Sequence, residues 1–183
     1  PAQIAAHYDN GTNTAPGTAY STLVAGDGPM GYWPLNESSI PAQPVLTNLG
    51  LAGTQLDGRY NYNSTLGVAG AQSPNYGGLE TNNLATYISA NGGSAWVPPV
   101  KNPAASNYLT ITAWIKRNGN QMGAATLLGR RVPGGEKSAF SFDGGGLNKL
   151  SYNWDDNASQ YNFDTKLTVP DNVWTFAAMV ITP

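Results

Sequence analysis

Leu109-Thr110-Ile111-Thr112-Ala113-Trp114-Ile115-Lys116 and Trp174-Thr175-Phe176-Ala177-Ala178-Met179-Val180 decide the fold class of this chain of 183 residues. In the first stretch the odd-numbered positions are apolar, while threonines occupy two of the positions between them, which is the period of a half-buried strand. The run from Val173 to Ile181 is apolar at positions of both parities, as in a central strand covered by a second sheet. Together these stretches predict an antiparallel sandwich of two sheets.

The segments around these strands support an all-β fold. Apolar and polar residues alternate over 140–142 and over 150–154, and the turn Asp143-Gly144-Gly145-Gly146 can adopt positive φ, so the two segments are predicted to form a hairpin. Tyr32-Trp33-Pro34-Leu35 reads as a short aromatic strand, with Pro34 at an edge or a strand end. Only one segment is predicted to be helical: it begins at Pro1 and ends at Asp9-Asn10-Gly11.

Composition and charge exclude several classes of function. The net charge is −2, so the chain has no electrostatic footprint for nucleic acid or an anionic membrane. It has no cysteine, and no apolar run is long enough for membrane insertion. A single histidine, His7, excludes a histidine-based triad or a multi-histidine metal site, and the three glutamates are too scattered for a paired-carboxylate glycosidase. These observations predict that the chain is not an enzyme.

The order of the motifs resembles the laminin-G-like family of concanavalin A-like lectin/glucanase (jelly-roll) domains. Members often open with a stretch similar to Tyr32–Glu37, continue with a strand similar to Thr110–Lys116, and place a strand similar to Trp174–Val180 after a turn such as Pro170-Asp171-Asn172. The resemblance extends from about Tyr20 to the end. It implies a module that binds or builds outside the cell and does not catalyse.

The same resemblance implies a domain arrangement. In that family further strands follow the position of Ile181, and a terminal helix similar to Pro1–Tyr8 ends the module. The chain is therefore predicted to come from a tandem array: residues 1–11 are the terminal helix of a preceding module, residues 12–20 are a linker, and residues 21–183 are a sandwich that lacks its C-terminal strands. A protomer of this kind with open sheet edges would pair with other chains.

Two kinds of binding site are predicted. Many laminin-G-like modules hold one calcium ion, and the densest set of oxygen ligands here is Asp155 and Asp156 with Asp164 close in sequence; turns also favour aspartate and asparagine for their own geometry. Aromatic residues in asparagine-rich stretches are candidates for stacking on sugars, although any one of them is more often packed within its loop. The candidates are Tyr60, Tyr62, Tyr76, Trp96 and Tyr161, with Tyr87 in similar surroundings.

Three functional hypotheses follow. The first is a non-catalytic adhesion or binding module, secreted or at the cell surface, whose partner is a glycan or an extracellular protein. The second is a structural subunit that self-associates into a filament or surface layer by sharing strands between protomers. The third is a segment of an enzyme whose catalytic domain lies elsewhere.

Overall fold

The computed structural model describes residues 2–37, 45–61, 63–89, 92–99, 108–121, 125–132, 135–142, 148–154 and 163–182. The chain forms two compact units, Pro1–Ala105 (unit 1) and Ser106–Pro183 (unit 2). Each unit has sheets of its own, and each is described by itself.

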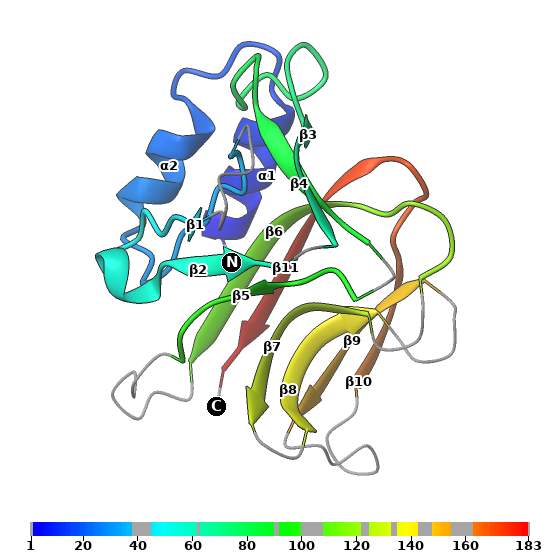
Figure 1. Ribbon diagram of the computed structural model, residues 1–183. Coiled ribbons are helices and arrows are strands. Elements are labelled where there is room, and N and C mark those ends of the chain that lie inside the picture. Colours follow the sequence, from blue (N-terminus) through cyan, green and yellow to red (C-terminus); the bar gives the residue numbers. More distant parts are fainter. Residues whose placement is uncertain are drawn as a thin grey trace. The chain divides into compact units, whose positions relative to one another are not determined.

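The described residues of unit 2 form two antiparallel sheets. β6 (Leu109–Lys116) pairs with β11 (Trp174–Ile181) over eight consecutive positions without a register shift. The other sheet has four strands that run side by side in the order β10-β9-β8-β7 (Figure 1). Its strands are β7 (Thr126–Val132), β8 (Gly135–Phe142), β9 (Lys149–Trp154) and β10 (Phe163–Thr168).

The core of unit 2 lies where these two sheets face each other. Phe140 and Phe142 from β8 form a buried cluster with residues of neighbouring elements, and Ile111 and Ile115 from β6 pack against it, as does Met179 from β11. Burying a side chain of this size contributes about 1.5–3 kcal/mol. The other buried members of the cluster are Leu150, Val169 and Ala177. This arrangement confirms the predicted antiparallel two-sheet sandwich. Of the odd positions of β6, Ile111 and Ile115 face inward as predicted, whereas Leu109 at the start of the strand is exposed.

The predicted hairpin strands pair as expected. Phe142 is opposite Leu150, and the β8–β9 ladder continues to Ser138 opposite Trp154. The glycine-rich turn at 143–147 lies outside the described residues. β11 differs from the prediction of a central strand, because among the described strands it pairs with β6 alone. Ala177 of β11 is buried in the core, while the other residues of the strand are half-buried or exposed.

Unit 1 combines helices with short strands. A three-stranded sheet has the order β1-β2-β5, and β3 pairs with β4 separately. The helical elements are α1 (Ala2–Thr12), α2 (Tyr20–Gly26) and the 3-10 turn η1 (Gly53–Leu56). The strands are β1 (Val45–Leu46), β2 (Gly58–Tyr60), β3 (Ser64–Ala69), β4 (Leu84–Ile88) and β5 (Ala95–Trp96).

The predicted N-terminal helix is present as α1, but the expectation of only one helix is wrong. α2 has no side-chain cap at Ala19 and is seven residues long, so local signals for it are weak. Tertiary contacts hold it in place: His7 Nε2 on α1 lies 2.7 Å from Asp27 Oδ2, and the His7 ring meets Tyr20 edge-on. α1 and α2 share one unit, while the assignment of residues 1–11 to a preceding module stays a prediction.

The backbone at the end of α1 lies in close contact with the loop that contains Gly77 and Gly78. A Cβ added at Gly77 would overlap the carbonyl oxygen of Asn13, and one added at Gly78 would overlap that of Asn10. The Gly78 carbonyl also accepts the backbone N–H of Tyr20 at 2.7 Å. Two successive glycines are required here because any side chain would separate the loop from the helix end.

The predicted aromatic strand at Tyr32–Leu35 is wrong. Residues 31–37 form no strand, and Leu35 has a φ of 59°. The Tyr32 N–H donates to Asn48 Oδ1 at 2.7 Å, and the Trp33 indole N–H donates to the carbonyl of Leu56 at 3.0 Å. Pro34 has no backbone N–H to donate. The polar groups of this segment therefore form hydrogen bonds with side chains and irregular backbone and not with a neighbouring strand.

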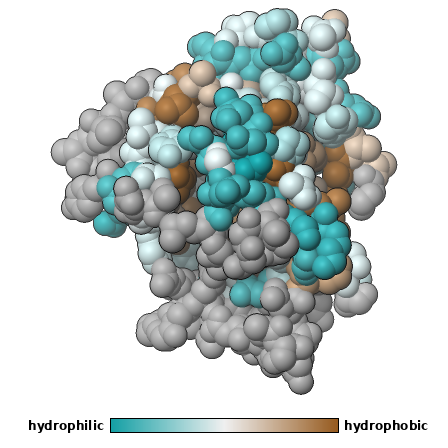
Figure 2. Space-filling model, turned by 90° about the vertical axis from the view of Figure 1, so that its right-hand side faces the viewer, coloured by the Kyte–Doolittle hydropathy of each residue, from teal (hydrophilic) through white to brown (hydrophobic). Residues whose placement is uncertain are grey.

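The surface is mainly hydrophilic where Figure 2 shows described residues, with apolar atoms in separate spots. None of the described helices has the length and apolar character required to cross a bilayer.

Candidate functional site

An exposed row of side chains crosses the sheet β1-β2-β5 of unit 1. Val45 is opposite Arg59, and Arg59 is opposite Trp96, so all three lie on one face of the sheet. All three are exposed, with Trp96 at 54% and Val45 at 50%. The face is small, and it places an aliphatic, a cationic and an aromatic side chain next to one another in a row.

Asn61 joins the two chain segments that carry this row. Its Oδ1 accepts the backbone N–H groups of Asn63 at 3.2 Å and Ser94 at 3.0 Å. Its Nδ2 donates to Ser94 Oγ at 2.7 Å and to the carbonyl of Gly92. The Asn61 N–H also donates to the Ser94 carbonyl at 3.0 Å. One side chain therefore ties the end of β2 to the loop that precedes β5.

The same network orients the Trp96 indole. Its Nε1–H donates to Ser94 Oγ at 3.0 Å, which is the hydroxyl that Asn61 also contacts. A Cβ at Gly58 would overlap the carbonyl oxygen of Trp96, so glycine allows β5 to lie against β2. The ring edge is thus held by a hydrogen bond while much of the side chain stays accessible.

Tyr60, which was predicted as a ligand-binding ring, lies on the opposite face of the sheet. It is 8% exposed, and its hydroxyl donates to Glu37 Oε2 at 2.7 Å. Burial, and then the neighbouring Glu37 carboxylate, raise the pKa of Tyr60, which remains neutral. Its ring has no exposed face for a sugar, so Tyr60 supports the sheet from behind.

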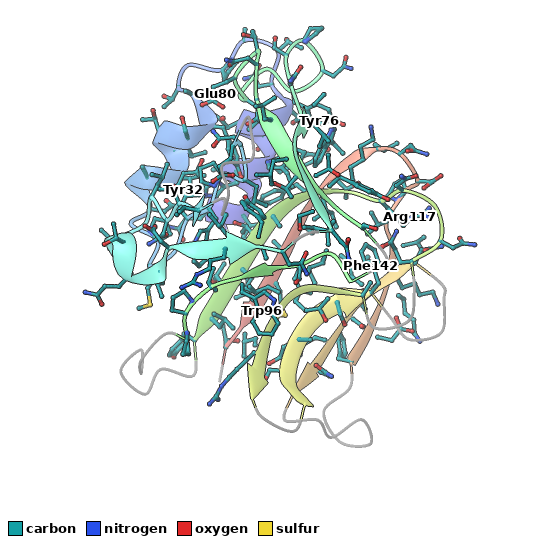
Figure 3. The ribbon with its side chains drawn as sticks, in the orientation of Figure 1. Tyr32, Tyr76, Glu80, Trp96, Arg117 and Phe142 are labelled. Atoms are coloured by element: carbon teal, nitrogen blue, oxygen red, sulfur yellow. The ribbon has the colours of Figure 1, made fainter. Side chains whose placement is uncertain are left out.

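Two of the other aromatic candidates lie in the described part of unit 1. Tyr76 is half-buried in the loop before β4, and Figure 3 shows it well separated from Trp96 within unit 1. Tyr87 is partly exposed on β4. Tyr62 and Tyr161 lie outside the described residues. Trp96 is therefore the predicted ring for which the structure gives both exposure and a fixed orientation.

The predicted calcium ligands are only partly described. Asp155 and Asp156 lie outside the described residues. Asp164 Oδ2 lies 2.7 Å from Lys166 Nζ and 4.0 Å from Lys149 Nζ, and hydrogen bonds from Lys166 lower the pKa of Asp164. Asp164 is therefore paired with a lysine ammonium group of its own strand. No cluster of three His, Cys, Asp or Glu residues suited to a metal occurs in the described part of the chain, and calcium binding stays a prediction.

Asn61, Ser94 and Arg59 were not predicted as site residues. Arg59 had only a weak local signal, a charged residue between two uncharged ones, and its exposure between the buried Gly58 and Tyr60 is a result of the fold. Asn61 and Ser94 had none, because asparagine and serine are the ordinary residues of turns. Their partnership appears only when segments 33 residues apart come together.

The family described as the concanavalin A-like lectin/glucanases superfamily, in its laminin G type, matches residues 89–182, just over half of the chain. The chain therefore belongs to this superfamily, which comprises modules that bind carbohydrate or protein and also includes glucanases. No curated protein and no solved structure matches the chain. The matched range contains Trp96 and every strand of unit 2, while Arg59, Asn61 and the Tyr32–Glu37 stretch precede it.

Proposed function

We propose that this chain is a non-catalytic module that binds carbohydrate outside the cell, in recognition or adhesion, through the exposed face of the β1-β2-β5 sheet. The observation that carries the proposal is the Trp96 indole, 54% exposed and anchored by Ser94. An anchored ring loses little rotamer freedom on binding and offers a broad apolar surface to the C–H face of a sugar.

The polar surroundings suit the same ligand class. Sugar hydroxyls need hydrogen-bonding groups at fixed positions. The Ser94 oxygen accepts from Asn61 Nδ2 and from the Trp96 indole, so its own O–H is available to donate to a sugar oxygen. Because the network already sets the position of this hydroxyl, a ligand would not have to order it.

The test is binding of the intact chain to a panel of immobilised oligosaccharides, with affinities then measured by calorimetry. We expect Trp96→Ala to weaken binding at least about tenfold, since truncating a central aromatic costs about 2 kcal/mol or more. Tyr8→Ala is the matched control, because Tyr8 is exposed to a similar extent, 52%, but lies on α1. Binding that survives Trp96→Ala, or no binding to any oligosaccharide, would contradict the proposal.

A second candidate is assembly by strand sharing, which the β11 edge favours. β10 carries Lys166 and a register shift, and β7 carries Arg130 and Arg131 with two register irregularities. Charges and bulges of this kind prevent edge-to-edge pairing. β11 has eight residues with no charge, no proline and no register shift, which suits it to accept a strand from another copy.

Sedimentation velocity over a concentration series tests this second function. We expect self-association that Val180→Lys abolishes, since Val180 is 39% exposed on β11. Val173→Lys, just before the strand, is the matched control and should leave association unchanged. A chain that stays monomeric at all concentrations would exclude strand sharing.

A further inference from the structure

We infer that the ligand of the β1-β2-β5 face is an acidic sugar, which bears a carboxylate or a sulfate, and that Arg59 binds the anionic group while Trp96 stacks on the ring. This inference rests on the proposed carbohydrate binding and adds the ligand class and a specificity-determining residue.

The register of the sheet places the two side chains together. Arg59 and Trp96 are directly opposite on antiparallel strands, where Cβ atoms are about 4.5–5.5 Å apart. Gly58 and Tyr60, the other residues of β2, are buried, so Arg59 is the side chain that β2 presents to solvent. A ligand that covers the indole would therefore lie within reach of the guanidinium.

The Arg59 guanidinium has no carboxylate partner among the described residues. The acidic residues nearest in sequence or contact to β2 have other partners: Asp57 Oδ1 accepts the N–H of Asn48 at 2.8 Å, and Glu37 accepts the Tyr60 hydroxyl. Arg59 thus offers its planar set of donors to solvent, in the geometry that matches a carboxylate or sulfate in a bidentate manner.

The combination favours an acidic sugar over other anions. An indole beside a single arginine has both an apolar ring surface and one cation, which matches a sugar ring with one anionic substituent. The net charge of −2 argues against polyanions such as nucleic acid, which require clustered basic residues for affinity. Val45, at the other side of Arg59, closes the face with an apolar side chain.

The experiment uses the intact chain and matched acidic and neutral probes. The uronate arm compares tetragalacturonate with its fully methyl-esterified form. The sulfate arm compares a carboxyl-reduced chondroitin sulfate tetrasaccharide, in which sulfate is the sole anion, with its desulfated form. Affinities are measured by calorimetry for the wild type, Arg59→Gln, Arg59→Lys and Trp96→Ala. Arg130→Gln, an exposed arginine on β7 of unit 2, is the control.

We expect the wild type to bind at least one acidic probe about tenfold or more tightly than its neutral partner, the effect of one charge-assisted bidentate contact. Arg59→Gln should remove this preference while binding to the neutral probe is kept; Arg59→Lys should keep part of it, and Arg130→Gln all of it. Trp96→Ala should weaken acidic and neutral probes alike. The arm with the larger preference identifies the anion as carboxylate or sulfate.

Three results overturn the inference in distinguishable ways. Equal affinity for acidic and neutral probes, or a preference that Arg59→Gln leaves intact, overturns the role of Arg59 while sugar binding at Trp96 stands. Absence of binding to all four probes, in a folded chain that still binds another oligosaccharide of the panel, overturns the inference alone. Absence of binding to the four probes and to the whole panel, in a chain whose circular dichroism shows it folded, overturns the inference together with the proposed function.

Discussion

Removing the Asn61 side chain should loosen the whole exposed face of the β1-β2-β5 sheet. Its amide contacts Ser94 twice, through the Ser94 N–H at 3.0 Å and the Ser94 Oγ at 2.7 Å, and both contacts are partly buried. Further contacts to Asn63, Ser64 and Gly92 are longer or more exposed. Asn61→Ala leaves these donors and acceptors without their partner. Because the loop is partly buried, water replaces the lost hydrogen bonds only in part.

The magnitude follows from the two contacts to Ser94. A hydrogen bond contributes about 1 kcal/mol net, so the two together contribute about 2 kcal/mol, and the exposed contacts add up to about 1 kcal/mol more. We therefore expect Asn61→Ala to lower the free energy of unfolding of unit 1 by about 2–3 kcal/mol, a large part of the stability of a typical domain. Asn61→Asp keeps the acceptor oxygen and loses the donor, so its effect should be smaller.

Urea unfolding measures the loss in the free energy of unfolding. Hydrogen exchange, measured on peptides, shows which part of the chain is loosened. Exchange should accelerate at the Ser94 and Asn63 amides, which donate to Asn61, while exchange in the β6–β11 pair of unit 2 should not change. Asn82→Ala, an exposed asparagine in a turn of the same unit, is the control. A loss below about 0.5 kcal/mol with unchanged exchange at Ser94 would refute the reasoning.

Two other predictions concern unit 1. Gly78→Ala should destabilise the chain by about 1–3 kcal/mol, because the new Cβ overlaps the Asn10 carbonyl oxygen; protease cleavage after α1 should accelerate, whereas Gly17→Ala, which has open space around it, should match the wild type. Burial raises the pKa of Tyr60 in the folded state, so its contribution to stability is complete below about pH 10, the pKa of an unfolded tyrosine, and is lost as the pH rises further. Unfolding free energies between pH 8 and 11 should fall less steeply in Tyr60→Phe, by up to about 1.4 kcal/mol per pH unit; an identical slope in both proteins would contradict this account.

Strand periodicity was sufficient to predict the sandwich of unit 2. The alternation in Leu109–Lys116 places Ile111 and Ile115 against Phe140 and Phe142, as the pattern indicates. Such a pattern is local, because successive side chains of a strand point to opposite faces whatever the partner strand is. The β8–β9 hairpin followed for the same reason, from two alternating segments close in sequence.

Local patterns failed where long-range contacts decide the conformation. The aromatic segment at Tyr32–Leu35 has strand-like residues, yet Asn48 and Leu56 bind its polar groups and no ladder forms. α2 has weak helix signals of its own and is held by contacts to α1 that include His7 and Asp27. In each case the partner lies at least 16 residues away, beyond any window in which period or propensity is read.

The sequence by itself determined the β-sandwich class, the apolar strands β6 and β11, and Trp96 as one candidate among several aromatic residues. Only the tertiary structure decided which aromatic residue is exposed, because Tyr60 and Trp96 lie on opposite faces of the same short sheet. It also decided that Arg59 is opposite Trp96 and that Asn61 orients Ser94. The physical reason is that a strand's own residues set its alternation, whereas its register and neighbours are set by hydrogen bonds to segments far along the chain.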